Sequence, residues 1–80
     1  MATVFLPRGL ASAVGGVDEV VIDAPRVAEL LRELVARYPA LGGRLGEMAV
    51  AVDGDIYNDP DYVPLGPDSE VYLVPRIAGG

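Results

Sequence analysis

The stretch from residue 27 to residue 38 constrains the fold of this chain more than any other part of the sequence. Its apolar residues recur at the spacing of one helix face, at Val27, Leu30, Leu31, Leu34, Val35 and Tyr38. Such a stripe predicts a single helix that buries one side against a core. We expect Asp23 to cap this helix, Pro25 to lie in its first turn, and Pro39 to end it.

Charged residues on the other side of the predicted helix are spaced for ion pairing. Glu29 precedes Arg32 by three residues, and Glu33 precedes Arg37 by four. Pairs at these spacings meet on a helix surface, and each contributes only a few tenths of a kcal/mol. The sequence therefore predicts one buried apolar side and one exposed charged side.

Short segments rich in β-branched and aromatic residues flank this helix. We expect strands at residues 3–6, 19–22, 48–52, 56–57 and 70–74. Residues 8–17 are predicted to be a loop that joins the first two strands into an antiparallel hairpin, and Asp53-Gly54 predicts a turn. The helix must then cover one face of a mixed sheet. This order predicts a β-grasp fold, an α+β fold with four to five strands packed on one main helix.

Composition restricts the possible functions. The chain contains no cysteine and no histidine, which removes thiolate chemistry and the commonest general base and metal ligand. We therefore expect no catalysis by this chain alone, no bound cofactor and no metal. Asp53, Asp55, Asp59 and Asp61 are close in sequence, but they lack the glycine and glutamate positions of a calcium loop.

Charge and hydropathy favour a protein partner. Twelve acidic and six basic residues give a net charge of −6, which disfavours nucleic acid and favours a partner with a basic face. No apolar run approaches the roughly 18–20 residues of a membrane helix. We expect no membrane association and a cytoplasmic location. All basic residues are arginine, so no lysine side chain could accept an isopeptide bond from a second copy.

The last five residues differ from the rest of the chain. Glu70 to Val74 predicts a buried strand closed by Pro75, and Arg76-Ile77-Ala78-Gly79-Gly80 follows. Glycine has no Cβ atom and adopts nearly any backbone conformation, so Gly79-Gly80 could enter a narrow channel in another protein. Five extended residues span about 15–18 Å. We expect residues 1–75 to form the β-grasp domain and residues 76–80 to form a flexible tail.

Together these features resemble the MoaD/ThiS family of ubiquitin-like sulfur carriers, which includes the small subunit of molybdopterin synthase. The resemblance covers essentially the whole chain. Its most specific part is a strand followed by proline, a short apolar linker and Gly-Gly. The segments that carry it are Val4–Pro7 with Leu10 and Gly15-Gly16, Val27–Leu31, Leu34–Pro39, Val50–Ile56, Pro67–Val71 and Val74–Gly80.

The resemblance implies a mechanism centred on Gly80. A separate adenylating enzyme would activate the Gly80 carboxylate with ATP, and a sulfur donor would displace AMP to leave a thiocarboxylate. A sulfur-accepting biosynthetic enzyme, similar to the large subunit of molybdopterin synthase, would then take the sulfur. The chain itself would supply no acid, base or nucleophile. The resemblance implies that Gly79 and Gly80 are the reactive residues and that the partner contacts are Pro75, Arg76, Ile77 and Ala78.

Several functions stay open at this stage. Molybdopterin synthesis is the leading pathway. Carriers for cysteine synthesis, thiamine synthesis or tRNA thiolation are alternatives, because residues 5–10 differ from typical molybdopterin synthase small subunits. Residues 58–64 also differ from typical family members. A ubiquitin-like modifier joined through Gly80 to target lysines is a different class of function. A third is an interaction module in which the tail has no role.

Overall fold

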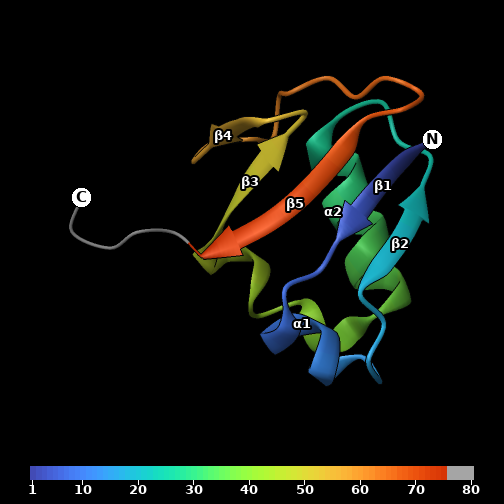
Figure 1. Cartoon of the computed structure of the whole chain (residues 1–80), viewed down its shortest axis with the longest axis vertical. Helices are drawn as coiled ribbons and strands as arrows, with labels where there is room; N and C mark the ends of the chain where they lie inside the picture. Colours follow the sequence, from blue (N-terminus) through green and yellow to red (C-terminus); the bar gives the residue numbers. More distant parts are fainter. Residues whose placement is uncertain (76–80) are drawn as a thin grey trace.

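Figure 1 shows the protein as a computed structural model, which describes residues 1–75. It contains five strands, two α-helices and two short 3-10 turns. In chain order they are β1 (Ala2–Phe5), α1 (Arg8–Ala13), β2 (Glu19–Ile22), α2 (Val27–Arg37), η1 (Pro39–Leu41), η2 (Leu45–Glu47), β3 (Met48–Val52), β4 (Asp55–Tyr57) and β5 (Glu70–Pro75).

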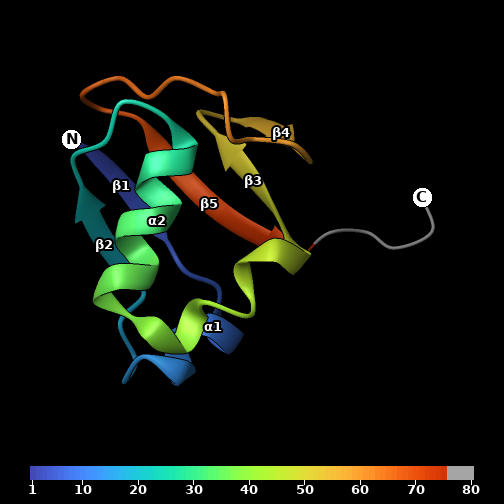
Figure 2. The same cartoon turned by 180° about the vertical axis from the view of Figure 1, so that it is seen from behind.

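The five strands form one mixed sheet in the order β2-β1-β5-β3-β4. β1 runs parallel to β5, whereas the β1–β2, β3–β5 and β3–β4 pairs are antiparallel. α2 lies across one face of this sheet (Figure 2). The β-grasp prediction is therefore confirmed, and all five predicted strands are present to within one residue at each end.

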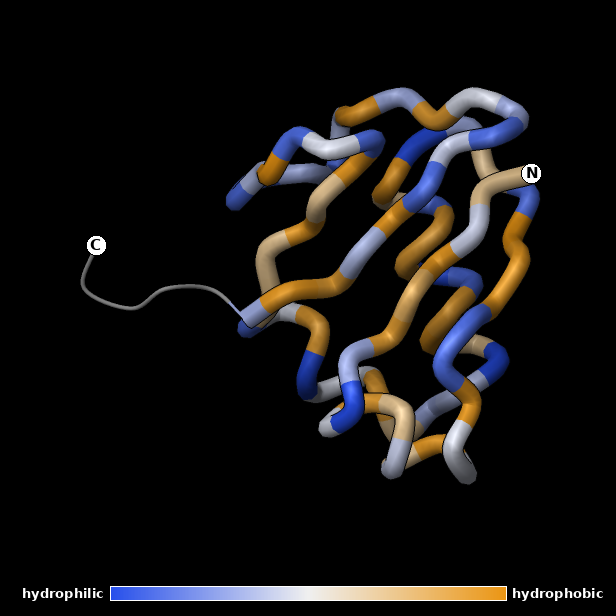
Figure 3. The backbone as a smooth tube through the Cα atoms, in the orientation of Figure 1, coloured by the Kyte–Doolittle hydropathy of each residue, from blue (hydrophilic) through white to orange (hydrophobic). Residues whose placement is uncertain are grey.

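The core lies between α2 and the sheet. Val27, Leu30 and Leu34 of α2 are completely buried and join Val4 of β1 and Val71 of β5 in one apolar cluster. Along β5, apolar and polar residues alternate in the colouring of Figure 3, and buried residues alternate with exposed ones from Glu70 to Leu73. This period of two directs alternate side chains to opposite faces, so only one face of the sheet packs on α2.

The segment after β1 is a helix, so the loop predicted for residues 8–17 is wrong in its first half. α1 spans Arg8–Ala13, and the Ala11 N–H donates to the Pro7 oxygen at 2.8 Å. Leu10 and Ala11 are buried and close the end of the core. A six-residue helix has little stability alone, so its formation depends on this burial rather than on a sequence pattern.

The N-terminus of α2 also differs from the prediction. The helix begins at Val27 after Arg26, and no side chain caps it. Instead, the N–H groups of Val27 and Ala28 donate to the oxygens of Val63 and Asp61 at 3.0 and 3.2 Å. These free N–H groups require acceptors, and the loop before β5 supplies them. Asp23 is therefore not the cap.

One of the two predicted ion pairs is present on α2. Arg37 pairs with Glu33 at 3.1 Å, and its Nη1 also donates to the Val21 oxygen on β2. Glu29 pairs with Arg26 rather than with Arg32, through hydrogen bonds of 2.6 and 3.1 Å. Arg26 is the extended residue just before α2, and the prediction that Pro25 lies in the first turn of the helix is wrong because α2 begins at Val27.

The predicted flexible tail, residues 76–80, lies outside the described residues. Within residues 1–75, no helix is long and apolar enough to cross a membrane.

Candidate functional site

β5 carries the chain through the middle of the sheet toward the predicted reactive residues. It lies between β1 and β3, and its last residue, Pro75, is paired with Met48 at the start of β3. Pro75 is exposed. Of the predicted site residues, Pro75 alone is placed; Arg76, Ile77, Ala78, Gly79 and Gly80 lie outside the described residues.

A shallow groove adjoins Pro75. Its volume is about 310 Å³, and its walls come from α1, the η2 region and the start of β3. Arg44 and Glu47 supply opposite charges at this groove, and Arg44 Nη1 donates to the Gly9 oxygen at 3.1 Å, which ties the η2 region to α1. The groove therefore presents both charge signs beside the strand end.

An apolar row crosses the face of the sheet opposite α2. The strand register places Phe5, Tyr72, Ala51 and Ile56 side by side on β1, β5, β3 and β4. The rings of Phe5 and Tyr72 are stacked, with centroids 4.5 Å apart and planes 12° from parallel. Tyr72 is 42% exposed and Ile56 is 69% exposed. No helix within residues 1–75 covers this face (Figure 1).

This row corrects the prediction that residues 70–74 form a buried strand. Val71 and Leu73 are buried against α2, whereas Glu70 and Tyr72 are exposed on the other face. The alternation Glu70-Val71-Tyr72-Leu73 is visible in the sequence and could have indicated a half-exposed strand. Phe5 and Tyr72 were missed as site residues because their contact needs the parallel pairing of β1 with β5.

The start of β5 is held by the turn between β3 and β4. Asp53 and Gly54 both have positive φ, 50° and 94°, as the two-residue hairpin turn requires. The Asp53 Oδ1 accepts a hydrogen bond from the Glu70 N–H at 2.9 Å, and the Asp53 N–H donates to the Glu70 oxygen at 3.0 Å. Both ends of β5 are therefore fixed to β3, which makes the exit of the strand well defined.

The ion pair between Arg26 and Glu29 shifts the pKa of both of its groups. The Arg26 hydrogen bonds hold the pKa of Glu29 below its ordinary value, and the Glu29 carboxylate raises the pKa of Arg26. This pair lies at the start of α2, not on the sheet face. Within residues 1–75, no three acidic side chains are grouped to hold a metal ion. The described part of the site therefore provides a groove and exposed apolar side chains for contact with another protein, rather than groups for acid–base catalysis.

Comparison with known proteins identifies the family. The ThiS family model matches residues 5–80. The chain belongs to the ThiS family. The family resemblance predicted from the sequence is thereby confirmed, and the match includes Gly79 and Gly80. No curated protein is significantly similar to this ThiS-family chain in sequence.

Solved structures confirm the fold of this ThiS-family chain. A structure from the Amycolatopsis orientalis BexX/CysO complex has a TM-score of 0.85 at 20% identity and covers 100% of both chains. The small archaeal modifier protein 1 of Methanosarcina acetivorans has a TM-score of 0.84 at 21% identity, covering 99% of this chain and 95% of the other. A chain of the Helicobacter pylori molybdopterin-converting factor complex of subunits 1 and 2 has a TM-score of 0.69 at 22% identity, covering 99% and 97%.

Proposed function

We propose that this ThiS-family protein is a sulfur carrier whose Gly80 carboxylate is adenylated and converted to a thiocarboxylate. The observation that carries the proposal is the extent of the family match, which runs through Gly79 and Gly80. The lack of histidine and cysteine supports it, because a carrier of this kind needs no general base or nucleophile of its own.

The chemistry requires activation of a poor electrophile. A carboxylate oxygen of Gly80 attacks the α-phosphorus of ATP on a separate adenylating enzyme, and pyrophosphate leaves. Hydrosulfide released by a sulfur donor then attacks the carbonyl carbon, a C–S bond forms, the bond to AMP breaks and AMP leaves, which yields the thiocarboxylate. Glycine at positions 79 and 80 presents no side chain to the channel that must surround these atoms. In this proposal ATP belongs to the activating enzyme, and the chain binds no cofactor.

The described surface supplies two places for partner contact. The row with Phe5 and Tyr72 offers exposed apolar and aromatic area of the kind enriched in interfaces. The groove beside Pro75 adjoins the strand end from which the reactive residues continue. We assign both to the adenylating and sulfur-accepting enzymes, with Arg76, Ile77 and Ala78 as further contacts. The Amycolatopsis and Helicobacter relatives are described in complexes with partner proteins, which supports such docking.

We further propose molybdopterin synthesis as the pathway that receives the sulfur. The similarity to a subunit of the Helicobacter molybdopterin-converting factor supports it. Carriers that feed cysteine, thiamine or tRNA thiolation share the same activation chemistry, and the identity of the acceptor enzyme decides among them.

A second candidate is a protein modifier joined through Gly80 to lysines of other proteins. The similarity to the small archaeal modifier protein 1 favours it. The adenylated glycine is common to both functions, and the nucleophile that displaces AMP differs: sulfur in one and a lysine amine in the other.

The deciding experiment is mass spectrometry of the C-terminal peptide of protein purified from its own host. We expect a sulfur-for-oxygen exchange at Gly80, located by fragmentation because oxidation of Met1 or Met48 adds nearly the same mass. Trapping with an electrophile provides an independent check. A Gly80 linked to lysines would favour the modifier. A plain carboxylate after incubation with ATP, activating enzyme and sulfur donor would contradict the carrier function, and with no Gly80–lysine linkage in the host protein it would favour the interaction module.

A further inference from the structure

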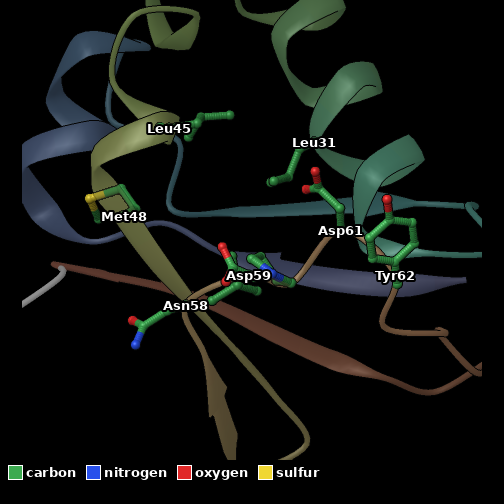
Figure 4. Close-up of a pocket in the computed structure, with 10 residues that line it drawn as sticks. Leu31, Leu45, Met48, Asn58, Asp59, Asp61 and Tyr62 are labelled. Carbon is green, nitrogen blue, oxygen red and sulfur yellow. The ribbon is translucent and has the colours of Figure 1, made fainter.

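One pocket of the described residues lies on the α2 side of the sheet, away from the row with Phe5 and Tyr72. Its volume is about 510 Å³, and it lies between α2, the η2 region, β3 and the loop after β4. Apolar side chains from three elements form its floor: Leu31, Leu45, Met48 and Val50. In Figure 4 the side chains of Leu31 and Leu45 extend toward each other across it.

The other wall of the pocket is acidic and aromatic. Asp59, Asp61 and Tyr62 line it, with Asp61 and Tyr62 beside Leu31 in Figure 4. All three are exposed, and Tyr62 is 84% exposed. No arginine lines the pocket, and the ion pairs within residues 1–75 involve neither aspartate. Within residues 1–75, two carboxylates that form no ion pair therefore face solvent beside an apolar floor.

This acidic wall is held in place by the backbone. The backbone oxygen of Asp61 accepts a hydrogen bond from the Ala28 N–H at 3.2 Å, and the backbone oxygen of Pro60 accepts one from the Val63 N–H at 2.9 Å. Pro60 itself is buried. The loop that caps α2 is thus the loop that presents the carboxylates, and a preformed wall lowers the ordering cost of binding.

We propose that this pocket binds a segment of a partner protein that carries an arginine next to an aliphatic residue. The aliphatic side chain and the arginine stem cover the apolar floor, and the guanidinium meets Asp59 and Asp61. A planar guanidinium can bond carboxylates through several N–H groups and can also stack on the Tyr62 ring. The proposed binding does not rest on the Gly80 chemistry proposed above, and the pocket lies on the other face of the sheet from the row with Phe5 and Tyr72; Met48 lines both this pocket and the groove beside Pro75.

Charge complementarity selects this occupant over the alternatives. Nucleic acid and anionic membrane surfaces would be repelled by the two carboxylates and by the net charge of −6. A fully apolar segment would desolvate Asp59 and Asp61 without pairing them, which is costly. A lysine would satisfy one charge but lacks the planar group that reaches two carboxylates and a ring.

The test is a titration of the full-length ¹⁵N-labelled protein with three blocked peptides, Gly-Leu-X-Leu-Gly with X as arginine, lysine or glutamate. We expect the arginine peptide to shift the amide signals of Leu31, Met48 and Tyr62 in a saturable way. Affinity should fall from arginine to lysine, and the glutamate peptide should not bind. Shifts that map to the sheet face, or equal binding of the glutamate peptide, would overturn the proposal.

Matched variants separate the local charge from the net charge. The double variant Asp59→Asn, Asp61→Asn should lower the affinity for the arginine peptide at least fivefold. The control is the double variant Asp18→Asn, Asp68→Asn, which removes the same charge away from the pocket. It should change this affinity less than twofold. If both double variants lose affinity for the arginine peptide equally, the net charge and not this pocket determines the binding. A several-fold gain in Arg76→Gln would show that Arg76 of this chain occupies the pocket, which would overturn the partner assignment.

Discussion

At the scale of single residues, the Arg26–Glu29 pair makes stability depend on pH. Hydrogen bonding to Arg26 lowers the pKa of Glu29 from its ordinary 4.5, so folding favours the ionised carboxylate. The stabilising contribution is present above the ordinary pKa and is lost as pH falls through the lowered value. Glu29→Gln should therefore reduce the loss of stability between about pH 6 and about pH 3. Urea unfolding at both pH values measures it.

The control for this prediction is Glu19→Gln on β2. Glu19 is exposed, and within residues 1–75 it forms no ion pair. Its replacement should leave the difference between the two pH values close to that of the parent protein. If Glu29→Gln and Glu19→Gln behave alike, the Arg26 hydrogen bonds do not stabilise the folded state.

At the scale of elements, two adjacent leucines of α2 have different environments. Leu30 is completely buried in the core, whereas Leu31 is half-buried and lines the open pocket. Leu30→Ala should cost about 3–5 kcal/mol through lost contacts and a cavity. Leu31→Ala should cost less than about 2 kcal/mol, because solvent already reaches the site. The free energy of unfolding, followed by circular dichroism in urea, tests the difference. Equal losses would mean that the pocket is closed in solution.

At the scale of the whole molecule, the proposed function places partner docking and the chemistry of Gly80 on different parts of the chain. Tyr72 presents its ring on the sheet face opposite α2, stacked on Phe5, and precedes residues 76–80. In the proposed function, Tyr72→Ala should raise the KM of the adenylating enzyme for this carrier at least fivefold with kcat nearly unchanged, because it removes a docking contact only. ATP–pyrophosphate exchange measures both constants.

The control for docking is Arg32→Ala, which shortens an exposed side chain on α2. It should change neither constant by more than about twofold, a difference of about 0.4 kcal/mol. A fall in kcat with unchanged KM for Tyr72→Ala would place the tyrosine in the chemistry instead of the docking surface.

The elements that sequence reasoning found correctly are those with a strong local period. The stripe of residues 27–38 and the short β-branched runs report their structure through neighbours only a few positions away. α1 and the start of α2 were missed because residues far away in the sequence stabilise them. Leu10 of α1 packs into the common core. The N–H groups of Val27 and Ala28 donate to the backbone oxygens of residues 63 and 61. A local pattern cannot contain an acceptor more than thirty residues away.

The sequence by itself determined the β-grasp class, the lack of histidine and cysteine chemistry, and the Gly79-Gly80 pair on which the proposed function rests. These properties follow from residue type and short-range order. The tertiary structure alone decided that β5 lies between β1 and β3, that Phe5 stacks on Tyr72, and that Asp59 and Asp61 border an apolar pocket. Each of these needs segments far apart in the chain to meet, and burial of the common core is what brings them together.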